Sequence, residues 1–221
     1  MTFEKHFNSY EENAIVQKKV AKHLASFFTN ILNPPKTILE IGCGTGIFSR
    51  ELVSYFPNAS LSLNDIFDTS AFFDNISYEK FIVHNAETMS LDSYDLISSS
   101  GCFQWFTDLQ TFLEKLSSHT NCLVFSMFLE DNLKEIKDHF QITLAYPSVS
   151  ETIHTLRKHY SKVEYQEEIF EIDFPTPLAA LRHLQATGVT GIGETNIRKI
   201  RSYPHKKLTY RVGYFKAERA N

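Results

Sequence analysis

Cysteine is scarce in this sequence, and its spacing excludes the usual metal-binding patterns. The 221 residues contain three cysteines, Cys43, Cys102 and Cys122, and none of them belongs to a CxxC pair or a Cys/His ligand pattern. Because structural zinc sites need such closely spaced ligands, we expect no metal. Cysteines that are few, odd in number and widely spaced favour a reducing, cytoplasmic compartment over a disulfide framework.

Long apolar runs are also missing. No stretch approaches the roughly 20 consecutive apolar residues that a membrane-spanning helix needs, so we expect no contact with a membrane interior. The opening residues, Met1 to His6, have no apolar segment, which predicts that there is no signal peptide. Hydrophobic residues nevertheless make up 43% of the chain, enough for the core of one α/β domain of this length.

Acidic residues are rare in the last part of the chain, although the whole chain has a net charge of −4. From Thr176 onward nine lysines and arginines stand against two glutamates. This asymmetry is typical of a surface that meets an acidic partner. It is equally compatible with a basic face that is merely solvated, and composition alone does not separate the two readings.

Helical and strand-like hydrophobic patterns alternate along the chain. We expect helices at residues 13–32, 47–55, 109–116, 131–139, 149–160 and 177–186. We expect strands at residues 37–41, 60–64, 81–83, 94–99, 122–127, 163–174 and 208–217. Such alternation implies right-handed crossovers and a parallel sheet with helices on both faces. The prediction is an α/β, Rossmann-like fold with a mostly parallel seven-stranded sheet. Its last two strands should be antiparallel, and the long segment between them could form a helical lid.

The most informative stretch is Leu39 to Gly46, where a strand runs into three alternating glycines and then a helix. Glycines allow a tight turn and close approach of a ligand, at the sheet edge where nucleotides bind. A nicotinamide fingerprint would need a further glycine where Ile47 stands. Glu40 would repel a pyrophosphate, yet it can accept a hydrogen bond from an ammonium group. This charge pattern favours S-adenosylmethionine, which carries an ammonium and a sulfonium but no phosphate.

Two further positions support a nucleoside ligand. Asp65 ends the second expected strand, at about the spacing of an acidic residue that binds ribose hydroxyls. Asn85, Ala86 and Glu87 follow the third expected strand, where the adenine ring should lie. Without them, the glycines alone would be equally compatible with a tight structural turn.

Taken together, these motifs resemble those of the class I S-adenosylmethionine-dependent methyltransferases. Leu39 to Gly46 looks like motif I of that family, Asp65 matches its ribose-binding acidic residue, and Gln104-Trp105 resembles the short motif after its fourth strand. Asn85 stands where the family usually has an aspartate, although an asparagine oxygen can still accept from the adenine amino group. The resemblance implies S-adenosylmethionine as co-substrate, bound by Gln17, Glu40, Gly42, Cys43, Gly44, Gly46, Asp65, Ile66, Asn85, Ala86, Glu87 and Ser100.

The flanks of this core are similar to those of the malonyl-[acyl-carrier protein] O-methyltransferases, the family that opens pimelate assembly for biotin. The similar segments are residues 7–17, 128–136, 144–148, 181–189 and 208–210. The resemblance implies methyl transfer to the free carboxylate of malonyl-[acyl-carrier protein] or of malonyl-CoA. It also implies one methyltransferase domain over residues 1–221. That domain would have an N-terminal helical cap (1–33), a cofactor-binding core (37–127), and a part with substrate-side helices, a lid and the final strands (128–221).

A malonyl carboxylate, with a pKa of roughly 4, is already ionised at neutral pH, so the transfer needs no general base. Burying that carboxylate requires a strong donor, and Arg182 is the first candidate because a guanidinium binds a carboxylate with two hydrogen bonds. Tyr10 could close over the site, and Gln104 and Trp105 should shape the pocket. The competing readings are a surface arginine on an amphipathic helix and aromatic residues that only pack in the core.

Other functions stay open at this point. A methyltransferase for a quinone or another natural product would carry the same core motifs, and so would a protein that binds the cofactor without turnover. A nucleic-acid methyltransferase fits less well, because Ser100-Gly101-Cys102-Phe103 stands where an Asn/Asp-Pro-Pro-Tyr/Phe tetrapeptide would be expected. We therefore expect no nucleic-acid partner.

Overall fold

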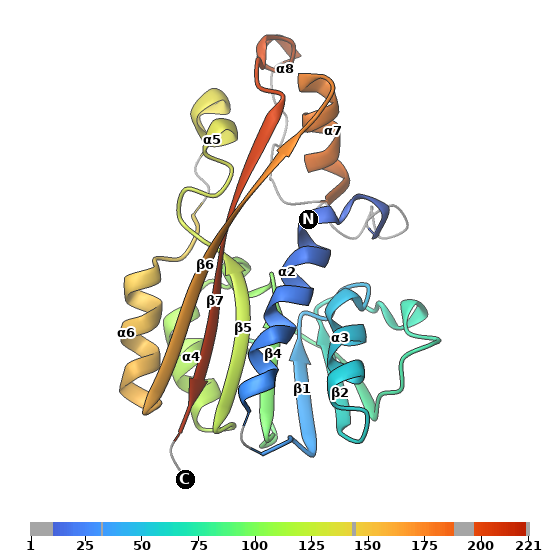
Figure 1. Cartoon of the computed structure of the whole chain (residues 1–221), viewed down its shortest axis with the longest axis vertical. Helices are drawn as coiled ribbons and strands as arrows, with labels where there is room; N and C mark the ends of the chain where they lie inside the picture. The colour runs from blue at the N-terminus through green and yellow to red at the C-terminus, as the bar shows by residue number, and fades with distance from the viewer. Residues whose placement is uncertain (1–10, 32, 143–144, 188–196, 220–221) are drawn as a thin grey trace.

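The computed structural model describes the chain except residues 1–10, 32, 143–144, 188–196 and 220–221 (Figure 1). No helix in the described part is both long and apolar enough to cross a membrane. The helices are α2 (Ile15–Ser26), α3 (Ile47–Tyr55), α4 (Leu109–Ser117), α5 (Lys134–Phe140), α6 (Val149–His159), α7 (Pro177–Thr187) and α8 (Ile197–Ser202). Short 3-10 turns are η2 (Phe27–Asn30), η3 (Ser70–Phe72) and η4 (Phe103–Trp105). The strands are β1 (Thr37–Ile41), β2 (Ser60–Asp65), β3 (Lys80–Val83), β4 (Leu96–Ser100), β5 (Cys122–Phe128), β6 (Lys162–Asp173) and β7 (Lys207–Glu218).

All seven strands form one sheet in the order β3-β2-β1-β4-β5-β7-β6. The strands from β1 to β5 pair in parallel, and β7 pairs antiparallel with both β5 and β6. The predicted fold class is confirmed. The strand order reverses direction beside β1, so the carboxyl ends of β1 and β4 open the crevice where such sheets bind ligands.

Helices cover both faces of the sheet, and each face has its own apolar core. Successive residues of β1 point to opposite faces: Ile38 joins the cluster that contains the apolar residues of α2 and α3, while Leu39 joins the cluster under α4 and α6. Figure 1 shows α2 and α3 over one face and α4 and α6 over the other. Because β1 is covered on both faces, four of its five residues are buried, among them Ile38, Leu39 and Ile41.

Several element boundaries differ from the sequence prediction, most clearly those of the first helix and the fourth strand. The first helix is α-helical only to Ser26 and then narrows to η2. The fourth strand begins at Leu96, because Tyr94 makes only an isolated bridge to Thr120. Asp95 lies between Tyr94 and Leu96 in the sequence. Its carboxylate accepts hydrogen bonds from the backbone N–H groups of residues 36 and 37, which fixes the start of β1. Helix α8 was not predicted; its six residues are too short for helical spacing to stand out.

The ladder between β6 and β7 pairs twelve residues on each strand and extends beyond the end of β5. Helices α7 and α8 lie in the connection between the two strands, at the tip of this extension (Figure 1). Beyond β5, side chains replace a neighbouring strand: Asn132 Oδ1 accepts from the N–H of Arg211 at 3.0 Å, and Glu135 Oε1 accepts from that of Thr209. The segment after β5 therefore holds the extension in place.

Candidate functional site

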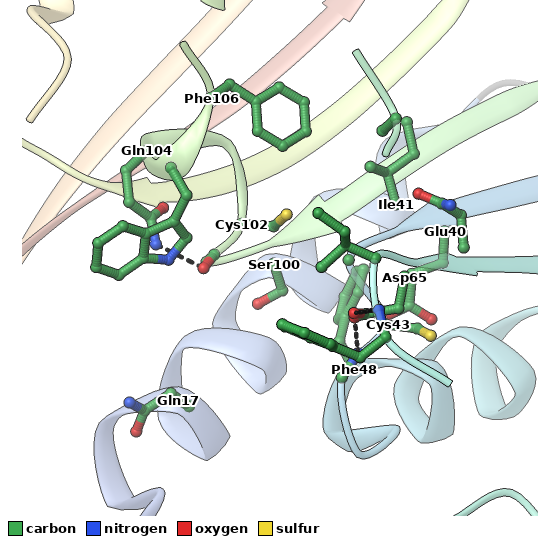
Figure 2. Close-up of a pocket in the computed structure, with 18 of the residues that line it drawn as sticks. Gln17, Glu40, Ile41, Cys43, Phe48, Asp65, Ser100, Cys102, Gln104 and Phe106 are labelled. Carbon is green, nitrogen blue, oxygen red and sulfur yellow. Dashed lines mark hydrogen bonds between the residues drawn. The ribbon is translucent and has the colours of Figure 1, made fainter. Parts of the chain in front are cut away.

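A cavity of about 510 Å³ opens at the carboxyl ends of β1, β2 and β4. It contains most of the residues predicted to form the site, although they come from distant parts of the chain (Figure 2). The predicted residues that line it are Gln17, Glu40, Gly42, Cys43, Gly44, Asp65, Ile66, Asn85, Ala86, Glu87, Ser100, Gln104 and Trp105. The volume is of the size that small-molecule sites have, roughly 300–1,000 Å³.

The glycines of the turn after β1 have separate tasks. Gly42 has a φ of +72°, and a Cβ there would lie 2.3 Å from the sulfur of Cys102, so only glycine fits. Gly44 has a φ of +53°, and a Cβ there would meet no atom within 4 Å, which means that its bare Cα borders open space. Gly46 lies outside the lining; its Cβ would meet Phe73 and Ile76 at 3.1 Å. Gly46 therefore serves packing rather than the cavity.

Asp65, at the end of β2, holds this turn in place. Its Oδ2 accepts from the backbone N–H of Gly44 at 2.8 Å, and its Oδ1 accepts from that of Phe67 at 3.0 Å. Burial raises the pKa of the Asp65 carboxyl, and the hydrogen bonds from Phe67 and Gly44 oppose that rise. Each carboxylate oxygen can accept more than one hydrogen bond, so Asp65 can also accept from the hydroxyls of a ligand.

Glu40 lies deeper, with 1% of its surface exposed, and accepts a hydrogen bond from the hydroxyl of Ser49 on α3. Burial raises the pKa of Glu40 to about 8; the Ser49 hydrogen bond opposes this rise and the nearby Asp65 adds to it. In the protein alone, the carboxyl is therefore largely protonated at neutral pH. A cation in the cavity would favour its ionised form. Burial also raises the pKa values of the Cys43 and Cys102 thiols, so neither is a nucleophile.

The residues after β3 hold the rim of the cavity together. Asn85 Oδ1 accepts from the backbone N–H of Glu87 at 2.9 Å. Glu87 Oε1 in turn accepts from the N–H groups of Thr107 and Asp108, at 2.9 and 3.1 Å, and so ties this loop to the start of α4. The side chain of Ile66 is 51% exposed and lies in the lining, where it offers an apolar surface to a planar ring.

The loop after β4 forms the opposite wall (Figure 2). The Gln104 side chain braces this loop: its Nε2 donates to the carbonyl of Gly101 at 2.6 Å, and its Oε1 accepts from the N–H of Phe128 at 3.4 Å. Trp105 beside it is 51% exposed and lines the cavity. Ser100 lies 3.3 Å from Ser126, hydroxyl to hydroxyl. Gln104 thus acts on the shape of this wall through its two hydrogen bonds to the backbone.

The residues predicted to bind the substrate do not all lie at the cavity. Tyr10 lies outside the described residues. Arg182 is exposed on α7 and does not line the cavity, so the described arrangement does not bring it to the other site residues. The buried face of α7 carries Ala180, His183, Leu184 and Thr187 instead, and Thr187 reaches the cavity. His183 is buried, and burial lowers its pKa, so it is a neutral imidazole at neutral pH.

Sequence reasoning missed several lining residues. Thr45 and Phe48 come from the turn and the first turn of α3, Phe128 from the end of β5, and Thr187 from α7. The first three could have been found, because residues at the carboxyl ends of parallel strands share one edge of the sheet. In the part of the chain that the structure describes, no cluster of His, Cys, Asp or Glu is arranged to hold a metal ion.

Known proteins match both the sequence and the fold. A family model described as a methyltransferase domain matches residues 10–169. The malonyl-[acyl-carrier protein] O-methyltransferase of Porphyromonas gingivalis is 33% identical over 186 residues, covering 82% of this chain and 73% of that protein. The one from Calditerrivibrio nitroreducens is 30% identical over 223 aligned residues, covering 93% and 90%.

Solved structures support the fold alone, because their sequence identities are low. The YcgJ protein from Bacillus subtilis superposes with a TM-score of 0.64 at 12% identity, over 90% of this chain and 100% of that one. The plantazolicin methyltransferase BpumL, solved with a desmethylPZN analogue and SAH, gives a TM-score of 0.60 at 15% identity, over 99% and 89%.

Proposed function

This chain belongs to the family of S-adenosylmethionine-dependent methyltransferases, and from that premise we propose that it methylates the free carboxylate of malonyl-[acyl-carrier protein]. The product would be the malonyl methyl ester that primes pimelate assembly in biotin synthesis. One observation carries the choice of substrate. The identity to a relative named for this reaction extends over 93% of the chain, well beyond the cofactor motifs that all such enzymes share.

The lining of the cavity suits S-adenosylmethionine. Glu40 would accept from the ammonium group of the ligand, directly or through water, and Asp65 from the ribose hydroxyls. The bare Cα of Gly44 leaves room for the ligand beside the turn. The terminal oxygen of the Gln17 side chain is buried without a hydrogen-bond partner among the described residues, which fits a site where a ligand supplies the donor. Ile66 and the backbone of residues 85–87 would surround the adenine.

For this reaction the protein mainly has to position the acceptor carboxylate next to the methyl group. The carboxylate of a malonyl thioester is the nucleophile, and it is ionised at neutral pH, so no residue needs to remove a proton. The walls formed by Trp105, Phe128 and Thr187 would hold one carboxylate oxygen in line with the methyl carbon and exclude water. Proximity and desolvation would then account for most of the rate.

The acceptor must enter from the side of α7, since α7 supplies Thr187 to the cavity. With 11 residues, α7 extends about 16 Å from its start at the tip to the cavity, at about 1.5 Å per residue. We expect the pantetheine arm of the carrier protein to follow this helix. Arg182 and Tyr10 stay candidates for closing over the substrate. A cytoplasmic location suits the three free thiols.

Methyl transfer from isotopically labelled S-adenosylmethionine would test the proposal. The acceptors to compare are malonyl-[acyl-carrier protein], malonyl-CoA and a quinone precursor. We expect label on the malonyl substrates and none on the quinone precursor. Label on the quinone alone would assign the chain to another branch of the family, and binding without transfer to any acceptor would indicate a non-catalytic protein.

A further inference from the structure

The lining of the cavity has acidic groups but lacks lysine and arginine, as far as the described residues go. Three carboxyl side chains line it, those of Glu40, Asp65 and Glu87. The remaining lining side chains are apolar or uncharged, apart from the imidazole of His84. This composition is unexpected for an enzyme whose acceptor carries a carboxylate into a partly closed site, because a buried carboxylate needs a compensating charge or strong donors.

The cationic groups near the cavity are turned elsewhere. Arg50 donates from Nη1 to the carbonyl of Thr45 and from Nη2 to the carboxylate of Glu11, and it does not line the cavity. His84 follows β3 at the edge of the sheet, separated from β4 by β2 and β1, and is exposed. Arg182 is exposed on α7. No described side chain therefore offers a positive charge to a carboxylate beside Ser100 and Phe128.

We infer that the acceptor carboxylate is held in this cavity by the positive charge of the methylsulfonium and by neutral donors such as the Ser100 hydroxyl, without a cationic side chain from the described residues. This inference rests on the proposed function and competes with the sequence-based role of Arg182. It implies that the malonyl group binds after S-adenosylmethionine. It also implies weak affinity of the malonyl group for the enzyme that holds S-adenosylhomocysteine, whose sulfur is neutral.

A lining without lysine or arginine, as the described residues form it, also favours the reaction. A lone pair of the carboxylate oxygen forms the bond to the methyl carbon, and the electrons of the breaking carbon–sulfur bond return to sulfur. The negative and positive charges disappear together and no proton moves. A fixed guanidinium would stabilise the ionised acceptor more than the transition state, in which its charge is partly lost, and would therefore raise the barrier. Phe128 and Thr187 line the cavity and carry no charge, so the carboxylate and the sulfonium interact mainly with each other.

A binding experiment separates the two sources of charge. Calorimetry on the full chain would measure the affinity of malonyl-pantetheine, which lacks the carrier-protein surface, in two complexes. One complex contains S-adenosylhomocysteine, and the other contains sinefungin, in which an amine-bearing carbon replaces the methylsulfonium. Two unit charges about 4 Å apart attract strongly in a partly screened site. We expect malonyl-pantetheine to bind at least tenfold more tightly to the sinefungin complex.

The methyl ester of malonyl-pantetheine is the matched control, since it has the same shape without the charge, and its affinity should be the same in both complexes. The preference for sinefungin should persist in Arg182→Ala. Equal affinities of the malonyl acceptor in both complexes, or an equal loss in both for Arg182→Ala, would overturn the inference in favour of a protein cation. Methyl transfer to malonyl-pantetheine, assayed in parallel, keeps the proposed function separate. Transfer with equal affinities removes only this inference, and no transfer to any malonyl thioester removes both.

Discussion

The carboxylate of Asp65 accepts a hydrogen bond from the backbone N–H of Gly44 at 2.8 Å, so the residue predicted to bind ribose also shapes the glycine-rich turn. The contact joins the ends of two neighbouring strands across 21 residues of sequence. Replacing Asp65 or Gly44 should therefore affect both the contacts to the ligand and the shape of the glycine-rich turn.

Replacing Asp65 should weaken cofactor binding in proportion to the acceptors that are lost. Asp65→Ala removes the oxygens that face both Gly44 and the ligand, and each charge-assisted hydrogen bond contributes about 1.5–3 kcal/mol. We expect at least a tenfold weaker affinity for S-adenosylhomocysteine in calorimetry. Asp65→Asn keeps one acceptor oxygen and should lose less. Circular dichroism would verify folding, and an alanine variant with unchanged affinity would remove Asp65 from the ribose site.

Gly44→Ala and Gly46→Ala form a matched pair. The new methyl group at position 44 would point into open space beside the cavity, whereas at position 46 it would press on Phe73 and Ile76. Both positions have positive φ, which costs roughly 1–2 kcal/mol for a residue with a Cβ. We expect Gly44→Ala to lose cofactor affinity with that modest loss of stability, and Gly46→Ala to lower the melting temperature further. If Gly46→Ala lost more cofactor affinity than Gly44→Ala, and Gly44→Ala lost more stability, the placement of the cavity beside Gly44 would be contradicted.

Glu40 should make both stability and binding depend on pH. Its pKa in the folded protein is raised to about 8 from 4.5, so the native state holds a proton that the unfolded chain releases. The free energy of unfolding should therefore fall as pH rises between about 5 and 8, with a smaller contribution of the same sign from Asp65. Glu40→Gln should flatten most of this slope in denaturant titrations.

The same proton should leave when a cationic ligand binds beside Glu40. At pH 7, calorimetry of S-adenosylhomocysteine in buffers with different ionisation enthalpies should report proton release, and Glu40→Gln should abolish it. Identical binding enthalpies in all buffers for the wild-type protein would show that the ammonium group lies elsewhere.

The sequence predicted the core well because its signals are local. Residues 37–41 and 47–55 were predicted at their observed bounds, since a buried strand, alternating glycines and an amphipathic helix each leave a pattern within a few residues. The orientation of α7 was also encoded: Ala180, His183, Leu184 and Thr187 follow helical spacing and define its buried face, which leaves Arg182 outside. The expectation that Arg182 holds the substrate did not take this spacing into account. In the described structure Arg182 does not line the cavity.

Other features lacked any local signal. The roles of Glu87 and Asn132 as acceptors for backbone N–H groups depend on partners 20 and 79 residues away. The lack of lysine and arginine among the lining residues that the structure describes is likewise a property of the assembled fold. No pattern within one segment predicts it.

The basic residues near the tip should guide an acidic carrier protein to the site. Lys199 donates to the carbonyl of Phe140, and Lys207 pairs with Glu171, so these two lysines are left unchanged. Arg198, Arg201 and Lys206 are exposed in the same part of the chain and form the test set. Reversing these three to glutamate should raise the Michaelis constant for malonyl-[acyl-carrier protein] several-fold and reduce its salt dependence, while sparing malonyl-CoA.

A charge-matched control for this surface is available at the other end of the molecule. Lys36, Arg157 and Lys158 are exposed there, and reversing them changes the net charge by the same amount. The control should leave both Michaelis constants near their original values. Equal effects of the two triple variants would mean that only net charge matters and that the tip does not bind the carrier protein.

The position of the transferred methyl group tests the central claim most directly. After incubation of the protein with methyl-labelled S-adenosylmethionine and malonyl-[acyl-carrier protein], mild alkaline hydrolysis should release the label as methanol, because only a carboxyl methyl ester gives that product. Mass spectrometry of the intact carrier protein before hydrolysis should show one added methyl group on the malonyl arm. Label that stays on the carrier protein after hydrolysis, or that never reaches the malonyl group, would contradict a carboxyl O-methyltransferase.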